Sequence, residues 1–322
     1  MTATTAVHAT GLVKTFGDFR AVDGIDLEVR RGEIFGVLGP NGAGKTTTMS
    51  MLATLLPIDA GQAEIFGVDV RREPHRIRQL VGVTGQYASV DENLTGSENL
   101  ILFARLLGQS IAQARRTATD LLGRFGLEEA RDRQIKDFSG GMRRRLDLAA
   151  SLIARPPLIF LDEPTTGLDP RTRGQMWDTI RELVAQGSTI LLTTQYLDEA
   201  DQLADRIAVI DHGRKVAEGT PDQLKTSVGS SSLHLRIADR DEVGRAAEIV
   251  GRVLSETPVL TPEAGGLNAA LRDTNQAADV LIALRQAGVD ITTAAVRQPT
   301  LDEVFLTLTG HHAEDDSTEE AA

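Results

Sequence analysis

The chain has 322 residues, of which 34 are Lys or Arg and 46 are Asp or Glu, so its formal net charge at pH 7 is −12. This acidic balance gives no electrostatic footprint for nucleic acid. The sequence contains no cysteine, which excludes disulfides, thiol catalysis and thiolate metal sites and suits a reducing compartment. It also lacks an apolar run of membrane-spanning length and a cleavable N-terminal signal. We therefore expect that the chain does not itself cross a membrane.

The first predicted elements are two short strands, 7–12 and 26–29, which flank a loop that carries Phe16. The Phe16 ring has two interpretations. It is either an ordinary core aromatic or a ring that stacks on the base of a nucleotide, since stacking tolerates many bases. Spacing alone favours the core, where large aromatic side chains are commonly found.

A glycine-rich loop follows a predicted strand at 34–38 and precedes a predicted helix that opens at Thr47. The order strand, G-x-x-x-x-G-K-[ST], helix is that of a phosphate-binding loop, the alternative being a glycine-rich turn that matches by chance. The glycines let backbone N–H groups surround an anion, and the helix N-terminus adds partial positive charge. We expect Lys45 to reach the β- and γ-phosphates and the Thr46 hydroxyl to bind Mg²⁺. The expected nucleotide-binding residues are Gly39, Pro40, Asn41, Gly42, Ala43, Gly44, Lys45, Thr46 and Thr47.

Two further strands are predicted at 63–70 and 80–84, and the second leads into Gln86. An amide at the end of a buried strand is able to bind Mg²⁺ or to orient a water molecule, whereas a lone glutamine is more often an ordinary surface residue. The pattern then changes to helix, beginning with a capping box at 95–98. We expect a helical subdomain over about 87–155.

Ser139, Gly140 and Gly141 stand at the expected N-terminus of a further helix, whose apolar residues recur at helical spacing. A helix N-terminus with these small residues is able to bind an anion. The alternative is a simple helix cap, which the residues alone favour. The three arginines that follow, 143–145, are interpreted as a solvated face.

An all-apolar strand, 158–161, runs directly into Asp162 and Glu163. Such a strand is buried on both faces of a parallel sheet, and ligands of these sheets bind at the carboxyl ends of the strands. The two carboxylates are therefore expected to point toward the phosphate-binding loop. Asp162 would hold Mg²⁺ directly or through its waters, and Glu163 would polarise the attacking water.

The rest of the chain is predicted to form the end of this domain and a second, smaller one. A strand at 189–194 ends at Gln195, and a hairpin at 206–217 closes the first domain. We expect a first domain over 1–226, a linker over 227–232, a second domain over 233–310 and an acidic disordered tail over 311–322. The second domain has the order β-α-β-β-α-β, which predicts a ferredoxin-like α+β module, and we interpret it as regulatory or dimer-supporting.

These motifs, in this order, resemble the ATPase subunit of an ATP-binding-cassette (ABC) transporter over roughly 7–218. The loop at 39–46 is similar to the Walker A motif and 158–162 to Walker B, with Glu163 in the place of the catalytic glutamate. The resemblance implies an α/β fold. Its parts would be a P-loop NTPase core with a RecA-like parallel sheet, an antiparallel β subdomain and a helical subdomain.

The remaining motifs of the family are also recognisable. Gln86 stands where the Q-loop glutamine belongs and Asp169 in the place of the D-loop aspartate. Phe16 matches the aromatic that stacks on adenine, so the resemblance reverses the preference for the core. The run 138–142 is similar to the signature motif, which in the family caps the γ-phosphate of the ATP held by the opposite subunit.

Two residues depart from the family pattern. The signature ends in Met142 instead of glutamine, a position that exporter-type subfamilies vary. Gln195 replaces the switch histidine. Its amide is able to hydrogen-bond a γ-phosphate but lacks the titratable charge of an imidazole. Hydrolysis is therefore expected to be slow or to rest wholly on Glu163.

The resemblance implies ATP and Mg²⁺ as cofactors and a homodimer that sandwiches two ATP molecules. It further implies a separately encoded integral membrane permease, met by the surface between Gln86 and Leu107. The location would be cytoplasmic, peripheral on the inner face of the cell membrane. The segments 193–201 and 299–306 are similar to daunorubicin-resistance-type exporter ATPases, which indicates efflux of a drug, another antibiotic or a lipid.

Two other functions compete with this interpretation. The first is a soluble cassette ATPase that acts on DNA or ribosomes. The acidic charge, the single cassette and the lack of a long heptad insertion between the Walker motifs all argue against it. The second is a nucleotide-gated regulator that binds ATP and barely hydrolyses it, which the glutamine at position 195 keeps open.

Overall fold

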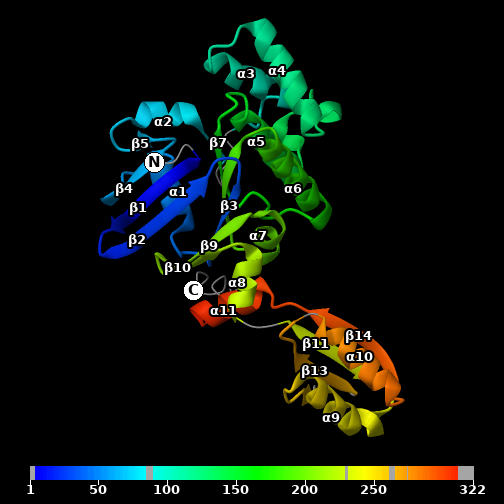
Figure 1. Cartoon of the computed structure of the whole chain (residues 1–322). Helices are drawn as coiled ribbons and strands as arrows, with labels where there is room; N and C mark the ends of the chain where they lie inside the picture. Colours follow the sequence, from blue (N-terminus) through cyan, green and yellow to red (C-terminus); the bar gives the residue numbers. More distant parts are fainter. Residues whose placement is uncertain (1–3, 85–89, 229–230, 261–264, 274, 311–322) are drawn as a thin grey trace. The chain divides into compact units, whose positions relative to one another are not determined.

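The computed structural model describes residues 4–84, 90–228, 231–260, 265–273 and 275–310 (Figure 1). Gln86 and the acidic tail at 311–322, both the subject of predictions, lie outside the described residues. The chain divides into two compact units, the first ending at Pro221 and the second spanning Asp222–Gly310. In the described part of the chain, no helix is long and apolar enough to span a membrane.

The first unit begins with an antiparallel sheet in the order β2-β1-β4-β5. Its strands are β1 (Thr5–Phe16), β2 (Phe19–Arg30), β4 (Ala60–Ile65) and β5 (Val68–Asp69). Buried residues such as Val7, Leu12, Ile25 and Leu27 fill its inner face, as expected for a sheet covered on one side. β1 and β2 are longer than the sequence predicts, since the pairing runs to a tight hairpin in which Phe16 faces Phe19.

A six-stranded sheet in the order β10-β9-β3-β8-β7-β6 forms the centre of the unit. Its strands are β3 (Ile34–Leu38), β6 (Val81–Thr84), β7 (Leu158–Asp162), β8 (Thr189–Thr194), β9 (Arg206–Asp211) and β10 (Arg214–Gly219). Only β10 runs antiparallel to its neighbour, and every residue of β3, β7 and β8 is buried. The sheet therefore has the two covered faces that its apolar strands predict.

Alternate residues of β7 belong to two different cores. Ile159 and Leu161 pack with α5 (Gly140–Ser151) and α6 (Pro170–Ala185). Leu158 and Phe160 pack with α1 (Lys45–Leu52) and the antiparallel sheet. The remaining helices of the unit are α2 (Pro74–Leu80), α3 (Gly96–Leu106), α4 (Ile111–Arg124) and α7 (Leu197–Leu203). This layering holds the carboxyl ends of β3, β7 and β8 at one edge of the sheet.

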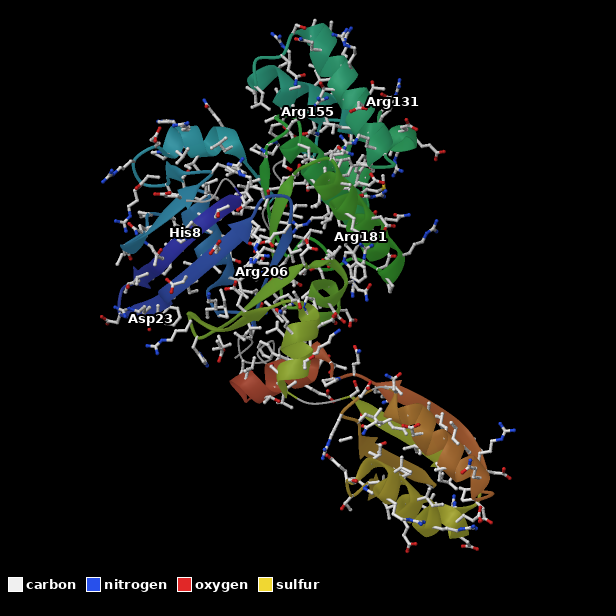
Figure 2. All side chains as sticks on the ribbon, viewed as in Figure 1. His8, Asp23, Arg131, Arg155, Arg181 and Arg206 are labelled. Carbon is white, nitrogen blue, oxygen red and sulfur yellow. The ribbon has the colours of Figure 1, made fainter. Side chains whose placement is uncertain are left out.

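An arginine braces the opposite, amino end of the central sheet. Arg206, which is labelled in Figure 2, begins β9 and forms ion pairs with Glu33, at 3.2 Å, and with Glu218. Burial raises the pKa of Glu33, and Arg206 opposes that rise. The bridge fixes the chain just before β3 to its neighbouring strands. It lies away from the strand ends that carry the expected site.

The predicted helical subdomain contains α3, α4 and α5, with 3₁₀ turns at Glu128–Ala130 and Ile135–Asp137. The predicted capping box at 95–98 is confirmed, since Thr95 and Glu98 each bond the other's backbone N–H. A second box joins Ser110 and Gln113 at the start of α4. The apolar faces of these helices meet in the same core as α6.

The second unit contains the predicted β-α-β-β-α-β order. Its elements are α8 (Pro221–Val228), β11 (Ser232–Ile237), α9 (Val243–Leu254), β12 (Val259–Leu260), β13 (Gly266–Ala270), α10 (Gln276–Gln286), β14 (Ile291–Arg297) and α11 (Leu301–Thr309), with a 3₁₀ turn at Arg240–Glu242. The antiparallel sheet has the order β12-β13-β11-β14 and packs one face against α9 and α10. The predicted linker at 227–232 is shorter than expected, since residues 227 and 228 lie in α8 and Ser232 begins β11. The proline at the first position of α8 favours a helix start there.

Candidate active site

The phosphate-binding loop leaves β3 and enters α1 at Lys45, with Gly44 as N-cap in the left-handed region at φ 99. A Cβ atom at Gly44 would lie 2.4 Å from the Ala21 carbonyl oxygen, and one at Gly39 would lie 2.3 Å from the Ile210 carbonyl oxygen. Both positions therefore require glycine. Because the N-cap is a glycine, no side chain caps α1, and its first N–H groups are left for an anion.

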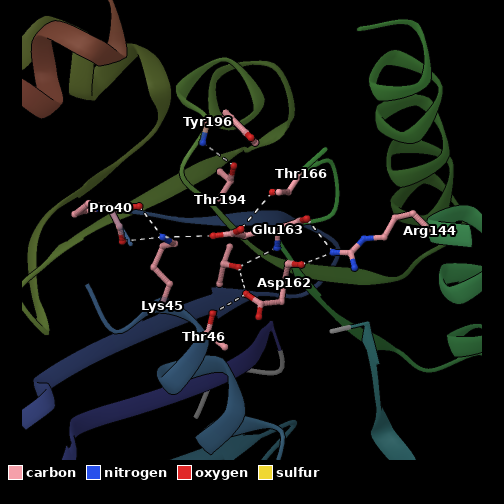
Figure 3. A network of polar contacts seen from close by, with 11 residues as sticks. Pro40, Lys45, Thr46, Arg144, Asp162, Glu163, Thr166, Thr194 and Tyr196 are labelled. Atoms are coloured by element: carbon pink, nitrogen blue, oxygen red, sulfur yellow. Dashed lines mark hydrogen bonds and ion pairs between the residues drawn. The ribbon is translucent and has the colours of Figure 1, made fainter. Parts of the chain in front are cut away.

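Lys45 lies across this loop. Its Nζ donates to the carbonyl oxygens of Gly39, at 2.7 Å, and Pro40, at 2.9 Å, and lies 3.8 Å from Glu163 Oε1 (Figure 3). Burial lowers the pKa of Lys45, while Glu163 and Asp162 raise it. The ammonium is therefore already within the loop, held by groups that a phosphate would replace.

Asp162 ends β7 beside the same loop and is buried. Its Oδ1 accepts hydrogen bonds from the hydroxyl of Thr46, at 3.0 Å, and from the hydroxyl of Thr193 on the adjacent strand β8. The Thr46 hydroxyl and the Asp162 carboxylate are hard oxygen ligands, and this pair suits Mg²⁺. The described residues contain no cluster of three or more His, Asp or Glu able to hold a metal. A cation here would take its other ligands from nucleotide phosphates and water.

Glu163 has a left-handed backbone conformation, φ 47, which is strained for a residue with a side chain. Its N–H donates to the Thr193 carbonyl oxygen at 3.1 Å, and its Oε2 accepts a hydrogen bond from the Thr166 hydroxyl at 3.2 Å. Together with the 3.8 Å contact to Lys45, these bonds turn a buried carboxylate toward the phosphate-binding loop (Figure 3). The sequence places the two acids at this strand end but carries no signal for the two threonines.

The three arginines after the signature-like run do not form a solvated face. Arg143 donates to the Ile135 and Lys136 carbonyl oxygens and pairs with Glu92 at 2.6 Å. Arg144 reaches the carbonyl oxygens of the segment that follows β7, and Arg145 donates to the Phe125 carbonyl oxygen. All three side chains are partly buried. That expectation is wrong because each of the three guanidinium groups donates to backbone carbonyls of other segments and is partly buried there.

Ser139 caps α5, its hydroxyl accepting from the Met142 N–H at 3.3 Å. Gly140 is exposed, and a Cβ atom at Gly141 would lie 2.6 Å from a side-chain carbon of Thr172 at the start of α6. Gly141 therefore allows the two helix N-termini to approach closely. The simple-cap interpretation is correct for Ser139, and binding of a partner's nucleotide stays a prediction.

Asp169 caps α6, since its carboxylate accepts from the N–H and the hydroxyl of Thr172, at 3.0 and 2.6 Å. These bonds lower the pKa of Asp169. Gln195 follows β8 directly, next to Thr194, whose hydroxyl accepts from the Tyr196 N–H at 2.9 Å. The pairing of Asp162 with Thr193 sets the ends of β7 and β8 side by side. Gln195 therefore follows the strand adjacent to β7, which leads into Glu163.

Phe16 is 48% exposed, so the core interpretation that spacing favoured is wrong. The ring stands at the hairpin between β1 and β2, and Lys14 Nζ lies 5.5 Å from its centre. An exposed ring is available for stacking on a base, which stays a prediction.

Comparison with known proteins agrees with this geometry. A family model described as ABC transporter matches residues 22–166, and one for the C-terminal domain of DrrA1-3-like ATP-binding proteins matches 219–309. The chain is 55% identical over 319 residues to the daunorubicin/doxorubicin resistance ATP-binding protein DrrA of Streptomyces peucetius, covering 99% of this chain and 97% of that relative. The chain belongs to the ABC transporter family.

This ABC ATPase has further relatives of similar length. It is 43% identical over 309 residues to the doxorubicin resistance ATP-binding protein DrrA of Mycobacterium tuberculosis, covering 94% and 93% of the two chains. A solved ATP-binding subunit of an ABC transporter superposes with a TM-score of 0.62 at 29% identity, covering 69% of this chain and 92% of that chain. The predicted fold is confirmed, and the ABC ATPase binds nucleotide and hydrolyses ATP.

Proposed function

We propose that the ABC ATPase powers export of a drug-like molecule through a separate integral membrane permease, working as a homodimer on the cytoplasmic face of the cell membrane. The names of the relatives, which refer to resistance to daunorubicin and doxorubicin, support this cargo class. The observation that carries the proposal is the convergence of Lys45, Thr46, Asp162 and Glu163 at the carboxyl ends of β3 and β7.

ATP would bind with its phosphates in the loop at 39–44 and at the start of α1. Lys45 would exchange its bonds to the Gly39 and Pro40 carbonyls for bonds to the β- and γ-phosphates. Phe16 would stack on the base. Thr46 and Asp162 would hold Mg²⁺, which when bound neutralises charge on the β- and γ-phosphate oxygens.

Hydrolysis would depend on Glu163. Its carboxylate accepts the proton of a water molecule whose oxygen attacks the γ-phosphorus, and the bond from that phosphorus to ADP breaks, leaving ADP and phosphate. Thr166 and Lys45 already orient this carboxylate. The side-chain amide of Gln195 would donate a hydrogen bond to a γ-phosphate oxygen. Gln86 would contact the cation or the water.

Two copies would enclose two ATP molecules. The exposed N-terminus of α5, with Ser139, Gly140 and Gly141, would contact the γ-phosphate of the ATP held by the second copy. Asp169 stands at the N-terminus of α6, which Thr172 holds against Gly141. Both helix ends would therefore approach the second nucleotide as one unit.

The permease would contact the exposed apolar side chains of the helical subdomain. Leu102, Leu106 and Leu107 on and after α3 are 44%, 73% and 56% exposed, and Ile111 at the start of α4 is 51% exposed. Neighbouring apolar side chains exposed in this number mark a protein contact surface. Leu102, Leu106 and Leu107 lie inside the segment predicted to meet the permease.

The test is transport itself. The wild-type ATPase and its Glu163→Gln variant would each be expressed with the permease in cells that lack other drug exporters, and daunorubicin uptake by inverted membrane vesicles would be measured. We expect ATP-dependent uptake with the wild type and none with Glu163→Gln, at equal amounts of complex. ATP hydrolysis without uptake of any drug, antibiotic or lipid tested would contradict the export function.

A further inference from the structure

Arg144 connects α5 to the segment that carries the two acids of the site. Its Nη2 donates to the Asp162 carbonyl oxygen at 2.5 Å and to the Glu163 carbonyl oxygen at 2.9 Å (Figure 3). Its Nε donates to the Pro164 carbonyl oxygen at 3.3 Å. One planar guanidinium thus holds three consecutive carbonyls. Its rigid fork of N–H donors suits this task, and a lysine ammonium does not reproduce it.

The surroundings of Arg144 favour a fixed side chain. The guanidinium is partly buried, and burial lowers the pKa of Arg144 while Asp147, Asp162, Glu163 and Glu199 raise it. A guanidinium remains charged at neutral pH, so its bonds to the carbonyls are charge-assisted and stronger than neutral ones. The charged guanidinium therefore places a fixed cation beside the catalytic segment.

Glu163 needs this support because its own backbone is strained. A left-handed conformation in a residue with a side chain is energetically unfavourable and persists only where neighbours determine it. Here the Glu163 N–H donates to the Thr193 carbonyl oxygen at 3.1 Å, while its carbonyl oxygen accepts from Arg144 at 2.9 Å. The N–H and the carbonyl group of Glu163 are thus both held. These bonds fix the direction of the Cα–Cβ bond that carries the carboxylate.

We propose that Arg144 is a positioning residue for ATP hydrolysis, which fixes the backbone at 162–164 so that the Glu163 carboxylate faces the γ-phosphate end of the phosphate-binding loop. This inference rests on the proposed role of Glu163 as general base. Arg144 would act through the backbone carbonyls of 162–164 that it bonds. Because Arg144 and Ser139 belong to the same helix with its cap, a movement of the N-terminus of α5 is transmitted directly to Glu163.

The test compares three substitutions in the complex with its permease. Arg144→Met removes all the bonds, Arg144→Lys keeps the charge without the fork, and Arg143→Gln is the control. Arg143 lies on the same helix and also donates to backbone carbonyls, but those of Ile135 and Lys136. Each variant is assayed for ATP affinity, steady-state kcat and thermal unfolding.

We expect Arg144→Met to lower kcat by about 10²-fold, the loss typical of a small misplacement of a catalytic group. ATP affinity should stay within about twofold, because the bonds to phosphate are unaffected. Arg144→Lys should recover part of the kcat, and Arg143→Gln should leave it unchanged. Equal kcat for Arg144→Met and wild type would overturn the proposal, and so would a parallel loss of ATP affinity and folding.

A double variant shows whether Arg144 acts through Glu163. In the Glu163→Gln background, Arg144→Met should cause no further loss of the residual turnover, because the group that it positions is already absent. If the fold-losses of the two single variants multiply in the double variant, Arg144 acts independently of Glu163. If Glu163→Gln alone hydrolyses ATP like wild type, the proposed role of Glu163 fails. If Glu163→Gln is inert and Arg144→Met is fully active, only the positioning role fails.

Discussion

The Nζ of Lys45 and the Oε1 of Glu163 lie 3.8 Å apart, and both side chains are buried. A buried charge is costly unless an opposite charge accompanies it, and each of these two groups provides the opposite charge for the other. A γ-phosphate that binds Lys45 would take over this role and leave the Glu163 carboxylate to accept a proton. In the proposed mechanism, the same two residues stabilise each other before nucleotide binds and then take part in hydrolysis.

Phe16 and Phe19 provide a matched test of base stacking. Both rings are exposed, at 48% and 63%, and the two residues pair across the hairpin. We expect Phe16→Ala to weaken ATP binding by about 1–3 kcal/mol, the usual contribution of one stacked base. Phe19→Ala should leave affinity unchanged. Titration with a fluorescent ATP analogue measures both, and equal affinities for the two variants would exclude stacking on Phe16.

Asp162→Asn tests the cation site. The amide keeps the shape of the carboxylate but loses the charge, so we expect the Mg²⁺ concentration needed for half-maximal ATP hydrolysis to rise at least about tenfold. Binding of ATP in the presence of a chelator should be little affected, because Lys45 and the loop hold the phosphates. An unchanged Mg²⁺ requirement would place the cation elsewhere. Thr193→Val, which removes one hydroxyl that donates to Asp162, should retain the wild-type requirement.

The buried carboxyl group of Glu199 should make the stability of the folded chain depend on pH. The side chain is fully buried on α7 and accepts a hydrogen bond from Trp177 Nε1 at 3.3 Å. Burial raises the pKa of Glu199, while the hydroxyls of Thr194 and Thr165 and the Trp177 indole oppose the rise. The folded chain then holds a proton that the unfolded chain releases. Stability is therefore lost as pH rises above the ordinary glutamate value of about 4.3.

Glu199→Gln removes this loss, because the amide accepts the Trp177 bond and never ionises. We expect its melting temperature to equal that of wild type near pH 4 and to exceed it increasingly as the pH rises above the ordinary glutamate value. The control is Glu98→Gln, since hydrogen bonds from Thr95 lower the pKa of Glu98. That variant should show the opposite trend. A constant difference between Glu199→Gln and wild type at every pH would contradict the account.

The permease surface is tested at Leu106. A glutamate at this position, 73% exposed, would place a charge in an apolar contact, and we expect Leu106→Glu to reduce co-purification with the permease at least about tenfold. Leu55→Glu, at 63% exposure after α1, should co-purify normally. ATP affinity of the isolated subunit should be the same for both. If only Leu55→Glu failed to co-purify with the permease, the contact surface would lie near Leu55 instead of on the helical subdomain.

The phosphate-binding loop and the apolar strand that leads into the two acids could be predicted, because their backbone requirements select particular residue types. Gly39 and Gly44 stand where a Cβ atom would strike a carbonyl, and β7 is apolar at every residue before Asp162. Arg144 could not be predicted, because its partners lie 18 to 20 residues away along the chain and a run of arginines indicates a solvated face. The exposure of the Phe16 ring could not be predicted either, since residue spacing does not reveal whether a hairpin is covered by another layer.

The measurement that tests the central claim most directly is Mg²⁺-ATP turnover by the ATPase reconstituted with its permease, for wild type, Glu163→Gln and Gln195→His. The claim is that Glu163 supplies the general base, although glutamine replaces the switch histidine. We expect wild type to turn over, Glu163→Gln to bind ATP and retain only residual hydrolysis, and Gln195→His to change turnover by less than about threefold. An inert wild type that Gln195→His activates would contradict the account and identify a nucleotide-gated regulator.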